Sequence, residues 1–150
     1  MANANEFLNK RVLKCTYDVA VNGGVDNTTY TIGKLPAGSL VTGGYGVVRT
    51  NFDDGADEST TISIGYTSAA AGFKAALAGS AYNALNPKTF TLLPGMGTGA
   101  DAAQDTPAEL AALVAASYIL NSTAVDVTVT LSNDTDFTAG KIDVYIEYVV

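Results

Sequence analysis

The stretch LPAGSLVTGGYGVV, residues 35–48, places a Pro-Ala-Gly turn before a valine-rich run that three glycines interrupt. A glycine inside a strand has no side chain to pack, and it occurs where a strand bends, bulges or lets another backbone come close. Gly43, Gly44 and Gly46 therefore predict a strand that bends between two sheets, bulges within its own domain or packs against a neighbouring subunit. The stretch indicates a β-protein with unusual demands on shape.

Other short runs alternate apolar and polar residues, which is typical of strands with one buried face. In the final run, KIDVYIEYVV, the apolar positions are Ile142, Val144, Ile146 and Tyr148, opposite Lys141, Asp143 and Glu147. The remaining runs are 11–21, 29–33, 61–67, 88–93 and 124–131. Seven or eight short strands separated by turns, without regularly alternating long helices, predict an all-β antiparallel sandwich or barrel.

Two segments carry helical signals instead. Residues 106–118, TPAELAALVAASY, place Thr106 as an N-cap, Pro107 in the first helical position and Glu109 for a capping box. We expect a helical turn or two from Pro107, and the sequence leaves open a change to strand near Ser117 and hence whether 106–120 are helix or strand. The Ala-rich segment 68–77 predicts a short helical crossing weakened by Gly72.

Length and charge limit the function. A chain of 150 residues is expected to form one domain, with a flexible N-terminal arm over 1–9 and a β-sandwich over 10–150. Its net charge of −7, with basic residues clustered only at Lys10, Arg11 and Lys14, argues against a nucleic-acid partner. No apolar run has membrane-spanning length and no secretory signal is visible, so we expect a soluble protein made in a cytoplasm.

Catalytic chemistry has little support. The chain contains no histidine, which removes the usual general base and the commonest zinc ligand. Its single cysteine, Cys15, lies in an alternating run and is expected to be a small buried residue. The acidic group Asp53, Asp54, Asp57 and Glu58 is interpreted as a solvated turn rather than a calcium loop, since it lacks alternate-position ligand spacing. We therefore predict no catalytic, cofactor or metal residues.

A family resemblance supplies what the residues alone do not. The segments carrying it are LPAGSLVTGGYGVVRTNFDDG (35–55), TISIGYTS (61–68) with the FKAAL that follows, and DFTAGKIDVYIEYVV (136–150). This combination resembles tailed-bacteriophage jelly-roll capsid cement or decoration proteins. The resemblance covers most of the chain, but 80–116 match poorly. It implies a jelly-roll-like antiparallel β-sandwich with one or two short helical connections.

The same resemblance implies a role and partners. Such proteins sit on the outer capsid surface of the virion, typically as homotrimers, and bridge copies of the major capsid protein without an active site or cofactor. Candidate contacts to capsid or to a neighbouring subunit are Phe7, Leu8, Gly43, Gly44 and Tyr45. Two alternatives remain open, a tail- or head-fibre-associated module that binds receptors or glycans, and a hydrolase that uses the carboxylates of the acidic group.

Overall fold

The computed structural model describes residues 10–67, 69–86, 89–92, 123–133 and 135–150. Its strands are β1 (Arg11–Asp18), β2 (Thr29–Leu35), β3 (Leu40–Asp53), β4 (Thr61–Tyr66), β5 (Ala69–Ala78), β6 (Thr89–Thr91), β7 (Val125–Ser132) and β8 (Ala139–Val149). Its helices are α1 (Val19–Asn22) and α2 (Gly79–Asn83). The predicted arm over 1–9 and the predicted helix from Pro107 lie outside the described residues.

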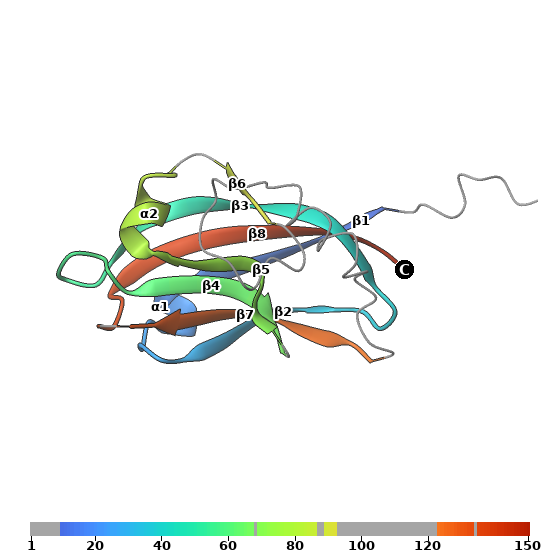
Figure 1. Ribbon diagram of the computed structural model, residues 1–150, viewed down its shortest axis with the longest axis horizontal. Coiled ribbons are helices and arrows are strands. Elements are labelled where there is room, and N and C mark those ends of the chain that lie inside the picture. The colour runs from blue at the N-terminus through green and yellow to red at the C-terminus, as the bar shows by residue number, and fades with distance from the viewer. Residues whose placement is uncertain (1–9, 68, 87–88, 93–122, 134) are drawn as a thin grey trace, which may run out of the picture.

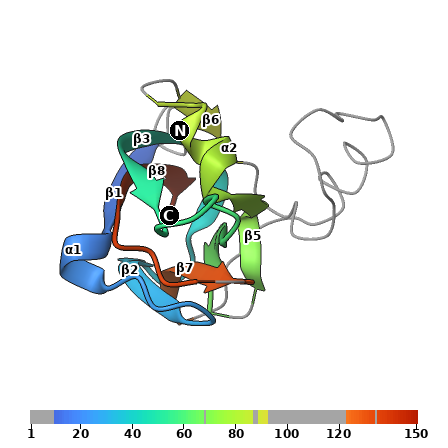
Figure 2. The same ribbon diagram turned by 90° about the vertical axis from the view of Figure 1, so that its left-hand side faces the viewer.

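The strands form two four-stranded antiparallel sheets, ordered β1-β8-β3-β6 and β2-β7-β4-β5 (Figures 1 and 2). The first strand pairs with the eighth, the second with the seventh, the third with the sixth and the fourth with the fifth. This is the arrangement of a long hairpin rolled into two facing layers, which defines a jelly roll. The predicted all-β sandwich with short helical connections is confirmed.

The opening stretch forms the turn and the first half of β3, the longest strand. The Ser39 N–H donates to the Pro36 carbonyl at 3.3 Å, and Gly38 occupies the left-handed position of this turn with φ 75°. The β3–β8 register shifts between Val41 and Gly43 and shifts again further along. These shifts bend β3 around the sandwich, so the strand is bulged as one of the three sequence interpretations predicted.

Aromatic rings fill the space between the sheets at the end where α1 and α2 lie. The Phe52 ring lies 6.4 Å from Tyr17, 6.1 Å from Tyr82 and 5.0 Å from Phe137, measured between centroids. The hydroxyls of Tyr17 and Tyr82 donate to the backbone carbonyls of Gly23 and Ile62. Rings contributed by β1, β3, α2 and the segment before β8 therefore pack together in the core.

The helical crossing expected over 68–77 is wrong, because Ala69–Ala78 is strand β5, paired with β4. Ala has a high helix propensity, but tertiary pairing overrides that preference. A Cβ on Gly65 of β4 would lie 2.0 Å from the Ala69 carbonyl oxygen, so the strands approach very closely. Small residues permit this approach, which accounts for the Ala-rich composition without a helix.

The strand expected over 11–21 ends earlier, at Asp18. The Asp18 side chain accepts a hydrogen bond from the Ala20 N–H and caps α1, while its own N–H donates to Asn22 Oδ1. Val21 is consequently 80% exposed rather than on a buried strand face. Local capping chemistry thus ends the strand although the alternating pattern of the sequence continues.

Cys15 is buried, as predicted, and burial raises the pKa of its thiol to about 11.

Candidate contact face on the β1-β8-β3-β6 sheet

Two rows of side chains cross the outer surface of the β1-β8-β3-β6 sheet. Strand register places Lys14, Tyr145, Tyr45 and Thr91 in one row and Thr16, Asp143, Val47 and Thr89 in the next. Residues opposite one another in antiparallel strands share a face and interact directly. We call this surface, together with Arg49 of β3, the contact face.

A stacked pair of tyrosines lies at the middle of the contact face. The Tyr45 and Tyr145 rings are 4.7 Å apart between centroids and inclined by 14°. Tyr45 remains 39% exposed, and the Lys14 ammonium lies 5.6 Å from the centre of the Tyr145 ring. An exposed aromatic ring held by a second ring is a rigid apolar platform on an otherwise polar surface.

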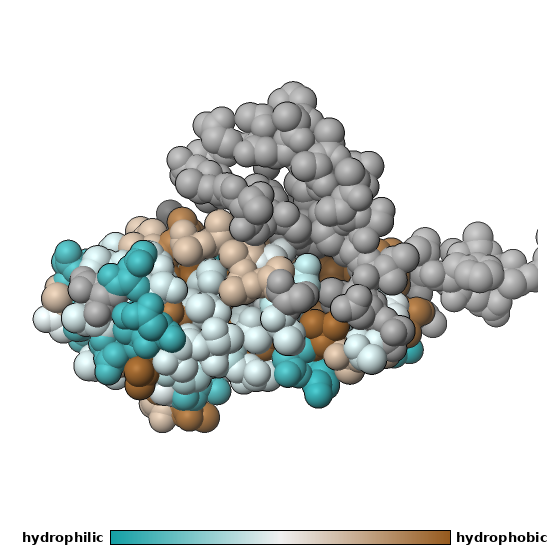
Figure 3. All heavy atoms as spheres, turned by 60° about the horizontal axis from the view of Figure 1, so that its bottom comes forward, coloured by the Kyte–Doolittle hydropathy of each residue, from teal (hydrophilic) through white to brown (hydrophobic). Residues whose placement is uncertain are grey.

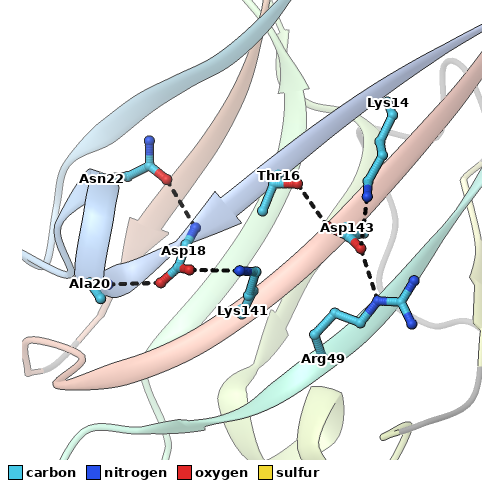
Figure 4. A network of polar contacts seen from close by, with 8 residues as sticks. All are labelled: Lys14, Thr16, Asp18, Ala20, Asn22, Arg49, Lys141 and Asp143. Atoms are coloured by element: carbon cyan, nitrogen blue, oxygen red, sulfur yellow. Dashed lines mark hydrogen bonds and ion pairs between the residues drawn. The ribbon is translucent and has the colours of Figure 1, made fainter.

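Asp143 is the polar centre of the contact face, as Figure 4 shows. Its carboxylate accepts hydrogen bonds from Thr16 Oγ1 at 2.7 Å and Arg49 Nε at 2.9 Å. Lys14 Nζ lies 3.4 Å from the same carboxylate, whose side chain is only 7% exposed. Burial raises the pKa of Asp143, but these hydrogen bonds and the Lys14 charge together lower it by more. The pKa of Asp143 therefore lies below its ordinary value. The group is therefore ionised at neutral pH.

Arg49 is positioned by this carboxylate but remains available at the surface. Its side chain is 48% exposed, and its Nη2 lies 3.5 Å from the Tyr145 hydroxyl. The hydrogen bond to Asp143 and then the contact with Tyr145 raise the pKa of Arg49. Two cations, Arg49 and Lys14, share one carboxylate, so the centre of the face carries net positive charge on a chain of net charge −7.

A second ion pair lies at the edge of the same sheet. Lys141 Nζ is 2.9 Å from Asp18 Oδ2, next to the cap of α1 (Figure 4). The hydrogen bond from Lys141 lowers the pKa of Asp18, and the Ala20 N–H lowers it further. This pair ties β8 to the start of α1, and its role is structural.

The structure separates the predicted contact residues. Tyr45 projects from the contact face, whereas a Cβ on Gly44 would lie 2.4 Å from the Tyr145 carbonyl oxygen. Gly44 thus permits β3 to approach β8 within one chain, and Gly43 lies at the register shift. Phe7 and Leu8 lie outside the described residues. Of the three predicted contacts that the structure describes, only Tyr45 contributes an exposed side chain to the contact face.

The acidic group lies in the β3–β4 loop and is only partly the solvated turn that was predicted. Asp54 is buried, and its carboxylate accepts hydrogen bonds from the backbone N–H groups of Ala56, Glu58 and Thr60. These bonds lower the pKa of Asp54 against the opposing effect of burial. In the described residues no three His, Cys, Asp or Glu side chains converge to hold a metal ion. The buried Asp54 carboxylate therefore holds the loop backbone in one conformation through these hydrogen bonds.

Sequence reasoning missed most of the contact face. It identified Asp143 as outward-facing on the last strand, but it did not connect that residue to Lys14 or Arg49. The missing information was register, because Arg49 and Asp143 are 94 residues apart. Alternation identified the outward positions of each strand, and only strand pairing could place them beside one another.

Comparisons with known proteins identify the fold. No protein-family model and no curated protein matches the sequence. A chain of the cyanophage Pam1 capsid asymmetric unit aligns with a TM-score of 0.62 and 15% identity, over 93% of this chain and 84% of that one. A chain of the acidic stable capsid structure of Helicobacter pylori bacteriophage KHP30 aligns with a TM-score of 0.56 and 16% identity, over 94% and 87%. The architecture is thus shared with chains of two phage capsid structures.

No helix in the described part of the protein is long and apolar enough to cross a membrane.

Proposed function

We propose that this chain is a structural protein of a bacteriophage virion, specifically a capsid cement or decoration subunit. It assembles as a homotrimer on the outer capsid surface, bridges copies of the major capsid protein and stabilises the head without an active site. The observation that carries this proposal is the jelly roll aligned over 93% of the chain with a chain of a phage capsid. The DFTAGK segment (136–141) that leads into the terminal strand and the glycine-interrupted strand, both part of the family resemblance, support the same role.

The contact face is consistent with a binding role. Its centre combines tyrosine and arginine side chains, which are enriched at protein interfaces. The platform is held rigid because the tyrosines stack and Asp143 fixes Arg49. Such a surface suits a large partner better than a small substrate, since the outer face of a sheet offers contact area and small ligands usually bind in concave sites.

The decisive experiment uses phage particles from which this chain has been deleted. We expect the purified chain to sediment as a trimer, to bind the deleted particles and to restore their resistance to heat and osmotic shock. Cryo-electron imaging of particles carrying a labelled chain is expected to show density outside the shell. A label inside the head or on the tail, or deleted particles as resistant as complete ones, would contradict the proposal.

The Tyr45–Tyr145 pair favours one alternative, a receptor- or glycan-binding module on a tail or head fibre. Sugars bind through their C–H faces to exposed aromatic rings, and Tyr45 presents such a ring. Binding on a glycan array that disappears in Tyr45→Ser would select this alternative.

The hydrolase alternative requires that replacing Asp53, Asp54, Asp57 and Glu58 by the corresponding amides abolishes a measurable hydrolysis. An unchanged rate of hydrolysis would exclude it.

A further inference from the structure

The β3–β4 loop lies at the same end of the sandwich as α1 and α2 (Figures 1 and 2), and the loops of this end carry six carboxylates. They are Asp26, Asp53, Asp54, Asp57, Glu58 and Asp136. Hydrogen bonds connect these loops, from the Asp26 N–H to Asp136 Oδ1 at 2.8 Å and from the Thr138 N–H to the Asp53 carbonyl at 2.7 Å. Within the described residues, none of the six forms an ion pair with Lys or Arg. We call this region the acidic end.

The β3–β4 loop presents part of this charge in a fixed conformation. Asp54 is buried and hydrogen-bonded to the loop backbone, whereas Asp57 is exposed and Glu58 is half-buried. The Ser80 N–H also donates to the Glu58 carbonyl at 3.0 Å, which joins the loop to α2. A preorganised loop loses little conformational entropy when it binds. Its outer carboxylates are therefore suited to a cationic partner.

The contact face has the complementary charge and unused donors. A guanidinium has five N–H donors, and Asp143 and Tyr145 engage only Nε and Nη2 of Arg49. The side chain is 48% exposed, so the outer edge of its guanidinium faces solvent. Carboxylates bind this edge through paired hydrogen bonds, which are stronger than those between neutral groups. Lys14 adds a second charge beside Arg49, and the Tyr45 ring adds apolar contact area.

We propose that the contact face binds the acidic end of a second copy of this chain, with Arg49 and Lys14 contacting Asp57 and Glu58. The argument for this occupant is charge complementarity between two surfaces of the same molecule. One surface lies on a sheet and the other on the loops at one end, so the contact can repeat head-to-tail from one copy to the next. A head-to-tail contact closes into a ring when its rotation permits, and three copies make such a ring. The inference rests on the homotrimer of the proposed function and names its interface.

Charge reversal in both partners tests the contact. Arg49→Glu alone and the double change Asp57→Arg with Glu58→Arg are each expected to weaken self-association about tenfold or more, measured by sedimentation equilibrium. A chain that carries all three changes is expected to associate again, because the charges are then exchanged rather than removed at every contact of the ring. Raising salt from about 0.05 M to about 0.5 M should weaken association of the unchanged chain.

Matched controls lie on the opposite sheet. Lys34 and Asp126 form an exposed ion pair there, so Lys34→Glu and Asp126→Lys make similar charge changes away from both surfaces. These controls are expected to associate like the unchanged chain. Because Arg49→Glu places a second carboxylate beside Asp143, Arg49→Gln is measured in parallel, with circular dichroism to confirm folding of each variant.

The outcomes separate this inference from the proposed function. Trimers that persist in all Arg49, Asp57 and Glu58 variants overturn the inference, while capsid binding by those trimers leaves the cement role intact. A chain that is monomeric at all concentrations but binds capsid also overturns it. Glycan binding that is lost in Arg49→Gln, without any self-association, overturns it by assigning the contact face to another occupant. Loss in both single-surface variants with recovery in the chain that carries all three changes supports it.

Discussion

The outer surfaces of the two sheets differ in chemistry although both come from alternating strands. The β1-β8-β3-β6 sheet carries the contact face, with its ion-paired Asp143 and stacked tyrosines. The outward positions of β2, β7 and β4 are mostly hydroxyl residues, namely Thr29, Thr31, Thr61, Ser63, Thr128, Thr130 and Ser132. Figure 3 shows mostly pale, intermediate hydropathy across the middle of the side where β2 and β7 lie. Charge is thus concentrated on one sheet and hydroxyl groups on the other.

The difference is informative because both sheets share one core. Either outer surface would satisfy a jelly roll, since folding requires only that the inward positions be apolar. On the hydroxyl surface, Thr29 and Thr130 contact one another through their Oγ1 atoms at 2.9 Å, which needs no external partner. On the contact face, two cations share one carboxylate and leave positive charge unmatched. The contact face is therefore the better candidate for binding.

Although their outer surfaces differ, both sheets contain a glycine at which an added methyl group is expected to lower stability by a similar amount. A Cβ on Gly44 would lie 2.4 Å from the Tyr145 carbonyl oxygen, and one on Gly65 would lie 2.0 Å from that of Ala69. We expect Gly44→Ala and Gly65→Ala each to lower the free energy of unfolding by about 1–3 kcal/mol, because backbone must move. Urea denaturation measures the change. Thr31→Ala, on an exposed strand position, is the control, and equal stability of all three variants would show that the close approaches do not matter.

The centre of the contact face is expected to contribute stability that depends on pH. Asp143→Asn removes a carboxylate that Thr16, Arg49 and Lys14 contact, so we expect a loss of about 1–2 kcal/mol at pH 7, reduced because both cations are half exposed. The folded pKa of Asp143 lies below its ordinary value of 3.8, so this contribution is present above about pH 4 and declines below it. Denaturation at pH 7 and pH 3 measures it. A difference between variants that is unchanged at pH 3 would contradict this prediction.

Two threonines at outward positions, buried Thr128 of one sheet and half-buried Thr16 of the other, are expected to respond oppositely to Thr→Val. Thr128 is buried, and its Oγ1 has no hydrogen-bond partner in the described structure. Thr128→Val is therefore expected to raise the free energy of unfolding by about 1 kcal/mol, because an unsatisfied hydroxyl is removed without loss of volume. Thr16→Val should lower it by about 1 kcal/mol, since it removes a hydrogen bond to Asp143. Thermal and urea unfolding report both signs, and changes of the same sign would disprove the contrast.

The smallest effect on stability is expected at Tyr45. Its ring is 39% exposed and stacks on Tyr145, so Tyr45→Ser should lower the free energy of unfolding by only about 0.5–1 kcal/mol. The free energy of self-association should fall by more than the free energy of unfolding, because in the assembled protein the Tyr45 ring contacts a partner rather than solvent. Comparing urea unfolding with sedimentation equilibrium tests the separation. Equal association of Tyr45→Ser and the unchanged chain would remove Tyr45 from the interface.

Sequence reasoning succeeded where a signal is local and failed where tertiary pairing decides. The turn before β3 and the alternation of β8 were predicted because Gly38 and the Ile142–Tyr148 series carry their signals within a few residues. Segment 69–78 was misread because its Ala-rich composition favours a helix, and pairing with β4 overrides that preference. The acidic loop was misread in part because Asp54 turns inward to bind its own backbone.

The sequence by itself determined the all-β class and the inward-facing positions of the alternating strands, and it showed that the strand containing Gly43 and Gly44 is irregular without deciding between a bend, a bulge and a subunit contact. These features follow from periodicity and from residues with local conformational preferences. Only the tertiary structure decided that Lys14, Arg49 and Asp143, from three different strands, form one charged centre. Alternation fixes the side of a strand on which a residue lies, but register and strand order decide its neighbours, and both depend on contacts between distant parts of the chain.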